Sequence, residues 1–220
     1  MDGKCSHCGF DDRYCEDKEH GRAPEHCCTT LYEDALKQAD ALYAGETLRF
    51  AAEAARQEAD CYEPLPQGGF RPVNPRIKET MDFCRRMGYK RIGLAFCVGL
   101  MKEGRMLGKL LEDNGFEVVS ASCKVGGVDK SRLGLSEEEK IEPGFEPMCN
   151  PIGQAMIMNE AKTDFNLALG LCVGHDSLFL KHSDALCTVI AAKDRVTGHN
   201  PLSALYTSDS YYKYLKGKKE

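Results

Sequence analysis

The sequence predicts an α/β protein with a doubly wound, mainly parallel sheet of four strands. From residue 74 onward, short apolar runs of strand length alternate with segments whose apolar residues recur at helical spacing. Three Asn-Pro pairs each precede one of the helical segments, where Asn caps and Pro fits the first turn. At 220 residues with 42% hydrophobic content, the chain can bury the core of one medium domain with a small appendage.

The first third of the chain has a different character. Residues 1–30 are polar, irregular and cysteine-rich, and cannot bury a core of their own. Residues 31–62 carry alanine and leucine at spacings of three and four, interrupted near Gly45, which predicts a helical hairpin. The stretch PLPQGGFRPVNP predicts a linker or a surface loop. We therefore expect a cysteine-rich metal-binding segment at 1–30, a helical hairpin and linker at 31–73, and an α/β domain with a cysteine-lined edge at 74–220.

The elements of the α/β domain follow in order. Asn74-Pro75 starts a helix that ends at Gly88, and strand 91–97, helix 101–114 and strand 116–123 then form a βαβ unit. Asn150-Pro151 opens a helix to about residue 161. The remaining expected elements are strand 165–172, helix 176–182, strand 186–192 and a short helical stretch after Asn200-Pro201. With the strands numbered in this sequence, the expected order in the sheet is 2-1-3-4.

Charge and cysteine content restrict the function. The net charge of −5 and the lack of a broad basic stripe argue against nucleic acid as a partner. The amino terminus has no apolar signal-peptide core and no window approaches the roughly 18 apolar residues of a membrane span, so we expect a cytoplasmic protein with no membrane association. In a reducing compartment, 12 cysteines indicate metal binding or thiol chemistry, although the even count also permits a disulfide framework.

Four cysteines are expected at one edge of the sheet. Strands one, two and three end in Cys97, Cys123 and Cys172, and Cys149 stands immediately before the Asn150-Pro151 helix start. The carboxyl ends of parallel strands form one edge, called here the rim, where ligands bind at the point of reversed strand order. Helix amino termini lower the pKa of nearby thiols, and glycine lets a ligand approach the backbone. These cofactor-binding candidates are Cys97, Cys123, Cys149, Cys172, Gly99 and Gly174.

The cofactor expected at the rim is an iron–sulfur cluster, of the 4Fe–4S type ahead of other types, or alternatively a zinc ion. The alternative to any ligand role is that each cysteine is a small buried apolar residue. Whether three or four rim cysteines bind is left open. Cys61, Cys84 and Cys187 lie within helix or strand bodies and are expected to be core or incidental residues.

Polar side chains near the rim are catalytic candidates. Lys193 and Arg195 are expected to hold a carboxylate or phosphate, and His175 and His199 to move protons, with Asp176 orienting one of them. Equally, Asp176 reads as a helix cap, and Asp194 and Arg195 as a surface ion pair. The long segment 124–148, between Cys123 and Cys149, reads either as a lid or as a solvated excursion.

The amino-terminal cysteines form a local group with the spacing Cys5-x2-Cys8-x6-Cys15-x11-Cys27, followed by Cys28. A metal ion or cluster is the most economical way to fold a segment without a core. Zinc and a second iron–sulfur cluster are both compatible with the spacing, as are Cys27 or Cys28 as the last ligand. The possible substitutes for a cysteine ligand are His7, His20 and His26.

Five motifs, together with the amino-terminal cysteines, resemble a family of uncharacterised prokaryotic proteins rich in cysteine, the domain of unknown function 1847. The motifs are FCVGL, CKVGG, MCNPIGQA, GLCVGHDSLF and KDRVTGHNP, and the resemblance covers nearly the whole chain. Members are usually labelled metal-binding proteins. The resemblance therefore implies metal binding, without a defined reaction.

The sequence as a whole predicts a metal-binding protein, an iron–sulfur protein with redox or desulfurising activity on a small molecule. Ligation by all four rim cysteines favours electron transfer to a partner, whereas ligation by three favours chemistry on a substrate. The alternatives are a non-enzymatic zinc-binding or redox-sensing and docking protein, and thiol catalysis without a rim metal. A nucleotide cofactor lacks support because neither GxGxxG nor a P-loop is present. The sequence does not indicate the substrate or the oligomeric state.

Overall fold

The structure is a computed structural model that describes residues 2–217. The chain divides into two compact units, Met1–Glu63 and Pro64–Glu220, which are described separately below. Within residues 2–217, none of the helices combines the length and the apolar character required to span a bilayer.

The second unit contains a four-stranded parallel sheet, as the sequence predicted. Its strands are β3 (Arg91–Phe96), β4 (Glu117–Ser122), β5 (Phe165–Leu169) and β6 (Cys187–Ala191). Their order in the sheet is β4-β3-β5-β6, with every neighbouring pair parallel. This is the expected order 2-1-3-4, and it places the reversal of strand order between β3 and β5.

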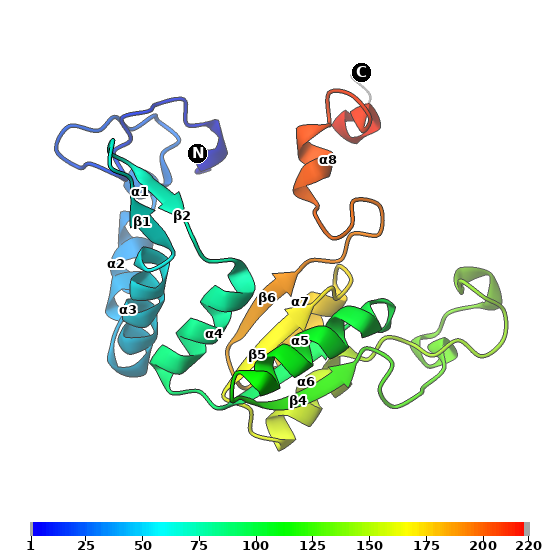
Figure 1. Cartoon of the computed structure of the whole chain (residues 1–220). Helices are drawn as coiled ribbons and strands as arrows, with labels where there is room; N and C mark the ends of the chain where they lie inside the picture. Colours follow the sequence, from blue (N-terminus) through cyan, green and yellow to red (C-terminus); the bar gives the residue numbers. More distant parts are fainter. Residues whose placement is uncertain (1, 218–220) are drawn as a thin grey trace. The chain divides into compact units, whose positions relative to one another are not determined.

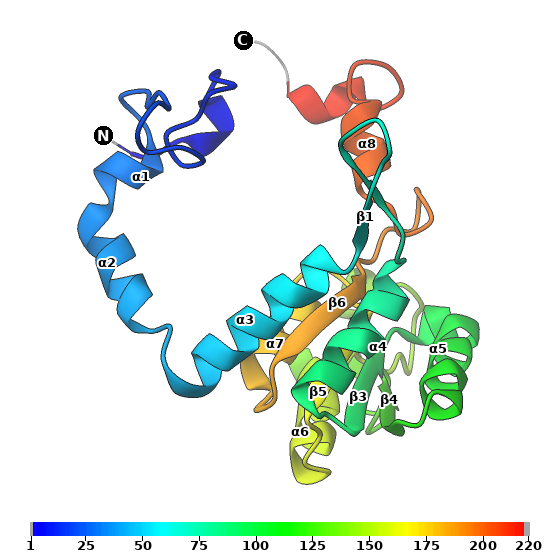
Figure 2. The same ribbon diagram turned by 60° about the vertical axis from the view of Figure 1, so that its left-hand side comes forward.

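Helices cover both faces of this sheet. Figures 1 and 2 show α4 (Arg76–Met87) and α5 (Met101–Asp113) on one face and α6 (Pro151–Glu160) and α7 (His175–His182) on the other. The two central strands are therefore buried on both sides, and all five residues of β5 are buried. The fold class predicted from the sequence is confirmed.

The three Asn-Pro pairs do not all act alike. Asn150 caps α6 as predicted, because its side chain accepts a hydrogen bond from Gly153 N at 2.8 Å and Pro151 occupies the first turn. In contrast, α4 and α8 (Leu202–Tyr206) each begin one residue later than expected, with Pro75 and Pro201 at the cap position. Proline has no amide hydrogen to donate, so a helix can begin directly after it without loss of a hydrogen bond. A short helix η5 (Lys213–Lys216) follows α8.

The first unit consists of an irregular segment followed by helices. A single turn η1 (Cys5–His7) precedes α1 (Cys28–Leu31), α2 (Glu33–Ala41) and α3 (Gly45–Ala59). The two helices predicted between residues 31 and 62 are α2 and α3, but they do not pack against each other along their lengths as a hairpin would. The stretch 64–75, predicted to be a linker or a surface loop, lies at the surface but contains the short strand β2 (Phe70–Pro72), which pairs with β1 (Tyr62–Pro64); Gly68 and Gly69 have positive φ in the turn between the two strands. Proline is rare in central strands and common in loops, so the prolines of this stretch favoured the prediction of a loop over that of two short strands.

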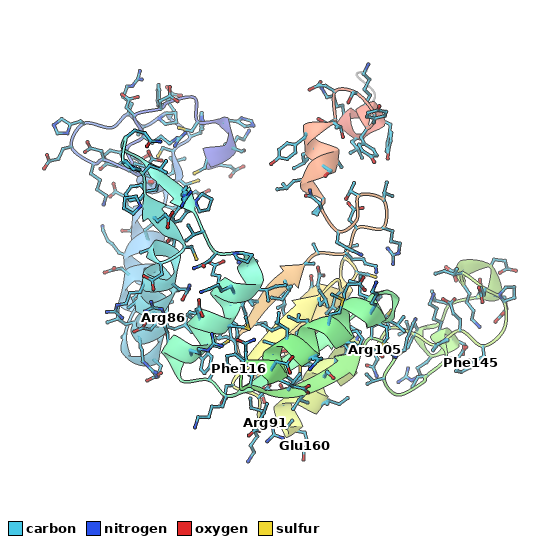
Figure 3. The ribbon with its side chains drawn as sticks, viewed as in Figure 1. Arg86, Arg91, Arg105, Phe116, Phe145 and Glu160 are labelled. Atoms are coloured by element: carbon cyan, nitrogen blue, oxygen red, sulfur yellow. The ribbon has the colours of Figure 1, made fainter. Side chains whose placement is uncertain are left out.

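The segment 124–148 folds back on itself. It contains η3 (Lys130–Leu133) and η4 (Glu137–Glu139), and its base is closed by Met148 N donating to Val128 O at 2.7 Å. Lys140, whose side chain is 3% exposed, pairs with Glu137 at 2.6 Å and Asp129 at 3.4 Å. Figure 1 shows the segment projecting beyond the carboxyl end of β4, and Phe145 near its far end is exposed (Figure 3). This geometry agrees with a loop that extends into solvent, which the sequence analysis gave as the alternative to a lid.

Replacing Gly93 by alanine should destabilise the sheet. A Cβ at this position of β3 would lie 2.0 Å from Asn166 Oδ1 and 2.7 Å from Met158 Sδ, and overpacking of a buried site typically costs about 1–3 kcal/mol. Gly108→Ala in α5 is the matched control, because the nearest atom to its Cβ would be 3.9 Å away, and alanine favours a helix interior by about 0.5–1 kcal/mol. Urea unfolding measures both; equal midpoints would contradict the close packing of β3 against β5.

Candidate metal centre at the sheet edge

Three cysteines from distant parts of the chain meet at the rim. Cys97 follows β3, and Cys123 extends β4 by one residue, with its N–H donating to Phe96 O at 2.8 Å. After the segment 124–148, the chain comes back to the rim at Cys149, because the following residue, Asn150, donates its N–H to Cys123 O at 2.7 Å. The sulfur atoms of Cys149 and Cys123 lie 3.9 Å apart, and the Cys97 thiol also hydrogen bonds to Cys123. Cys97 and Cys123 are buried, and Cys149 is half-buried.

The Cys123 thiol controls the charge of this group. Hydrogen bonding with Cys123 lowers the pKa of Cys97 to about 4 and that of Cys149 to about 5, while the same two contacts raise the pKa of Cys123 itself. Smaller contributions come from Lys193 beside Cys97 and from Lys124 beside Cys149. The directions of these shifts favour the thiolate form at Cys97 and Cys149 and the protonated form at Cys123. Thiolates are the form in which cysteine binds metals.

Cys172 has a different partner. Its sulfur accepts a hydrogen bond from Arg195 Nη2 at 3.1 Å, and its carbonyl accepts from the N–H groups of His175 and Asp176 at 3.0 Å each. Of the four cysteines predicted at the rim, Cys123 therefore contacts both Cys97 and Cys149, and Cys172 lies beside a guanidinium.

The two rim glycines have different roles. A Cβ on Gly99 would lie 3.4 Å from Lys193 Nζ and 3.8 Å from Cys97 Sγ, so glycine leaves space where these groups meet. Gly174 stands at the cap of α7 with φ +81°, a conformation that favours glycine, and no atom lies within 4 Å of where its Cβ would be. Gly99 borders the cysteine group, whereas Gly174 shapes a turn.

The predicted catalytic residues also separate into two sets. Lys193 adjoins Cys97, and His175, which influences the pKa of Cys149, has its Nδ1 buried without a hydrogen-bond partner among the described residues. Asp176 instead accepts a hydrogen bond from Ser177 N at 2.8 Å in the first turn of α7. His199 accepts one from Asp194 N at 3.2 Å within its own loop.

The Asp194 carboxylate does not form the surface ion pair that the sequence offered as an alternative. It accepts hydrogen bonds from Val196 N and Thr197 N at 2.9 Å each, and Arg195 faces Cys172. The bonds from Thr197 and Val196 lower the pKa of Asp194. The loop after β6 is thus a closed turn that directs Arg195 toward the rim.

Two residues of the site were missed from the sequence. Gln154 on α6 is fully buried, and its Nε2 donates to Ala121 O at 2.7 Å and to Phe96 O at 3.2 Å. It thereby joins the ends of β4 and β3 directly below Cys123 and Cys97. The sequence could have indicated Gln154, because it is a polar residue on the apolar face of the helix predicted after Asn150-Pro151. Lys124, which follows Cys123, was not considered because it begins the long excursion.

In the first unit, the structure brings together only part of the predicted metal group. The Cys5 and Cys28 thiols are hydrogen bonded, which raises the pKa of Cys28. Cys8 is half-buried, Cys15 is exposed, and Cys27 is buried at the cap position of α1. Across residues 2–217, no three or more histidine, cysteine or acidic side chains are arranged to hold a metal ion.

The fold and the rim define an α/β protein whose sheet edge carries several cysteines. The chain belongs to the family described as protein of unknown function (DUF1847), whose model matches residues 27–190. This confirms the family resemblance of the sequence motifs. The matched range includes all four rim cysteines and Cys27 and Cys28. The predicted site residues outside it are Cys5, Cys8, Cys15, Lys193, Arg195 and His199.

The chain is similar to a relative of known sequence and to a solved structure. It is 44% identical over 173 residues to an uncharacterised protein of Methanocaldococcus jannaschii, a match that covers 79% of this chain and 83% of the relative. The crystal structure of Dph2 from Pyrococcus horikoshii aligns with a TM-score of 0.35 and 16% identity, over 70% of this chain and 33% of that one.

The charge state of the cysteine group predicts unusual thiol reactivity. In metal-free protein, Cys149 should react with iodoacetamide at a nearly constant rate between about pH 7 and pH 9, because a thiol with pKa about 5 becomes protonated only as the pH falls through that value. Cys123→Ala removes the hydrogen-bond donor, so the pKa of Cys149 should rise and its rate at pH 7 should fall. Peptide mass spectrometry measures the rate. A rate that falls about tenfold per pH unit below pH 9, as for an unperturbed thiol, would contradict the lowered pKa.

Proposed function

We propose that the chain binds a metal centre through Cys97, Cys123 and Cys149, and that this centre is an iron–sulfur cluster acting on a small anionic molecule. The observation that carries the proposal is the contact of Cys123 with both neighbouring cysteines at the carboxyl edge of the sheet. Two further observations support the proposal: hydrogen bonding with Cys123 lowers the pKa of Cys97 and of Cys149, which favours the metal-binding thiolate form, and His175 Nδ1 is buried without a hydrogen-bond partner among the described residues.

The donor set favours an iron–sulfur cluster. Thiolate ligands select zinc, copper(I) and iron–sulfur clusters over harder metals. Structural zinc sites need four protein ligands, and typical catalytic zinc sites with three include at least one histidine. The three cysteines around Cys123, with Cys172 engaged by Arg195, supply only three of the four ligands of a structural zinc site, and a fourth would have to come from another residue. Iron–sulfur clusters, in contrast, are commonly held by thiolates alone.

The chain's own residues supply the remaining functions. Bound by three thiolates, a cluster with one iron free of protein ligands supplies a Lewis acid or an electron. Lys193 and Lys124 offset the negative charge of the thiolates, and Lys193 and Arg195 bind a carboxylate or phosphate of the substrate. His175, at the start of α7, holds or releases a proton near Cys149. Reduction of a small molecule or removal of its sulfur fits this arrangement.

A single zinc ion in a non-enzymatic protein is the second candidate, and one distance favours it. Two thiolates that share a tetrahedral ion at about 2.3 Å lie about 3.8 Å apart, close to the 3.9 Å between the Cys149 and Cys123 sulfurs. His175 Nδ1 would then complete a Cys3His set.

Serine substitutions at the rim distinguish these candidates. In anaerobically purified protein, Cys97→Ser, Cys123→Ser and Cys149→Ser should each lose most of the iron and sulfide, because each removes one of three ligands. Cys187→Ser is the matched control: Cys187 lies in β6 with its sulfur 3.4 Å from Ala185 O, a contact that serine can make. Iron, sulfide and zinc analysis with absorption spectra measures the outcome. Zinc in place of iron, lost from the same three variants, would support the second candidate.

Removing Lys193 should weaken anion binding. In metal-free protein, inorganic phosphate should slow iodoacetamide labelling of Cys149. Lys193→Met should raise the phosphate concentration for half protection by about tenfold, as expected from loss of one charged hydrogen bond. Lys181→Met, an exposed position in the last turn of α7, is the control. Protection that is the same in both variants would exclude Lys193 from the substrate site.

A further inference from the structure

We propose that Cys149 and Cys123 form a thiol–disulfide exchange pair in the metal-free protein. Cys149 reacts with a low-molecular-weight disulfide, and Cys123 then displaces the small thiol from Cys149. The products are a Cys123–Cys149 disulfide and two small thiols. The basis is the contact between the two sulfur atoms, which lie 3.9 Å apart at the rim. This activity goes beyond the function proposed above, because the exchange itself requires no metal ion or cluster.

Main-chain hydrogen bonds hold the two cysteines together. Asn150 N donates to Cys123 O at 2.7 Å, and Asn150 Nδ2 donates to Val125 O at 3.2 Å. These bonds involve no ligand, so the two cysteines should stay adjacent in the metal-free protein. A disulfide needs its sulfur atoms about 2.05 Å apart. Because Cys149 lies outside the helices and strands, a small shift of its side chain closes the gap to Cys123.

Exposure determines which thiol reacts first. Cys149 is half-buried, whereas Cys123 and Cys97 are buried. The rate of thiol–disulfide exchange depends on access to the attacking sulfur, so a disulfide in solution reaches Cys149 before the other two. Cys123 contacts the Cys149 sulfur and is therefore positioned to resolve the mixed disulfide.

With glutathione disulfide as the oxidant, the exchange proceeds in two displacement steps. The Cys149 thiolate attacks one sulfur of glutathione disulfide, so that a mixed disulfide forms as the S–S bond of the oxidant breaks and one glutathione thiolate leaves. The Cys123 thiolate then attacks the Cys149 sulfur, and the second glutathione thiolate leaves. The two thiol protons of the protein pass to the two leaving thiolates. The protein loses two electrons, and glutathione disulfide gains them.

A lysine beside the pair favours an anionic oxidant such as glutathione disulfide. Lys124 directly follows Cys123, and its Nζ donates to Pro147 O at 2.5 Å, two residues before Cys149. Glutathione disulfide has a net negative charge at neutral pH, because its carboxylates outnumber its ammonium groups. Attraction to the Lys124 ammonium therefore raises the concentration of the oxidant near Cys149.

Closure of the disulfide also affects metal binding at the rim, an effect that rests on the function proposed above. Cysteine binds metals as the thiolate. The disulfide removes the thiolates of Cys123 and Cys149 and leaves Cys97 as the remaining proposed ligand. Loading of the rim with iron should therefore require the reduced pair.

Peptide mapping of metal-free, full-length protein tests the exchange pair. Trypsin places each of the three cysteines in a separate peptide, with Cys97 in residues 92–102, Cys123 in 110–124 and Cys149 in 141–162. After incubation with glutathione disulfide, mass spectrometry should recover peptides 110–124 and 141–162 mainly as one disulfide-linked species. Dithiothreitol should separate this species again.

Three variants separate the roles of the cysteines. In Cys123→Ser the linked species should be lost and glutathione should remain on Cys149, because no thiol displaces it. In Cys149→Ser both the linked species and this mixed disulfide should be lost. Cys187→Ser is the matched control, since Cys187 is a half-buried cysteine within β6, and it should form the linked species as wild type does. Circular dichroism checks that each variant has folded.

Two results in wild type would overturn the pair: a link between peptides 92–102 and 110–124 in place of the expected one, or glutathione retained on Cys149 to the same extent as in Cys123→Ser. Incubation with ferrous iron and sulfide tests the effect on metal binding. Reduced protein should take up iron, and oxidised protein should do so only after dithiothreitol. Formation of the expected link without iron uptake by reduced protein supports the exchange pair and contradicts the proposed metal centre.

Discussion

The geometry of the rim depends on the backbone of Cys123. Its N–H continues the parallel ladder between β4 and β3 by bonding to the carbonyl of Phe96, and its C=O accepts the N–H of Asn150. The first bond fixes Cys123 beside Cys97, and the second brings the chain back beside Cys123 after the excursion. The Cys123 sulfur accepts a further hydrogen bond from Val98 N at 3.3 Å. Three cysteines that are far apart in the sequence are thus positioned by main-chain hydrogen bonds, which do not depend on any bound ligand.

The surroundings of these cysteines explain why the pKa values of Cys97 and Cys149 are lowered although both side chains are partly buried. Burial alone raises the pKa of a thiol, as it does for Cys84, whose pKa is raised to about 12 within the core. At the rim, hydrogen bonds from Cys123 and the nearby charges of Lys193 and Lys124 outweigh burial. Gln154 adds rigidity below the site, because one fully buried amide group binds the carbonyl oxygens of both strand ends. The same sheet edge therefore supplies position, charge and support.

Much of this arrangement could be predicted from the sequence, for a physical reason. Strand order and strand ends follow from apolar periodicity and from short connections, so Cys97 and Cys123 were placed correctly at adjacent strand ends. Side-chain partners do not follow from periodicity. The pairing of Cys172 with Arg195 depends on the closed turn made by Asp194, and the role of Gln154 depends on which face of α6 meets the sheet. The hairpin of β1 and β2 was missed because prolines outweighed its weak strand pattern.

The central claim is that Cys97, Cys123 and Cys149 hold one common iron-containing centre. Anomalous diffraction from anaerobically grown crystals, recorded on both sides of the iron absorption edge, tests this most directly. The account predicts the iron peaks of one cluster, with the sulfur atom of each of the three residues bonded to an iron, and with Cys172 still beside Arg195. An iron-free rim with the three sulfurs in contact only with one another, or an iron peak bound elsewhere in the chain, would contradict it.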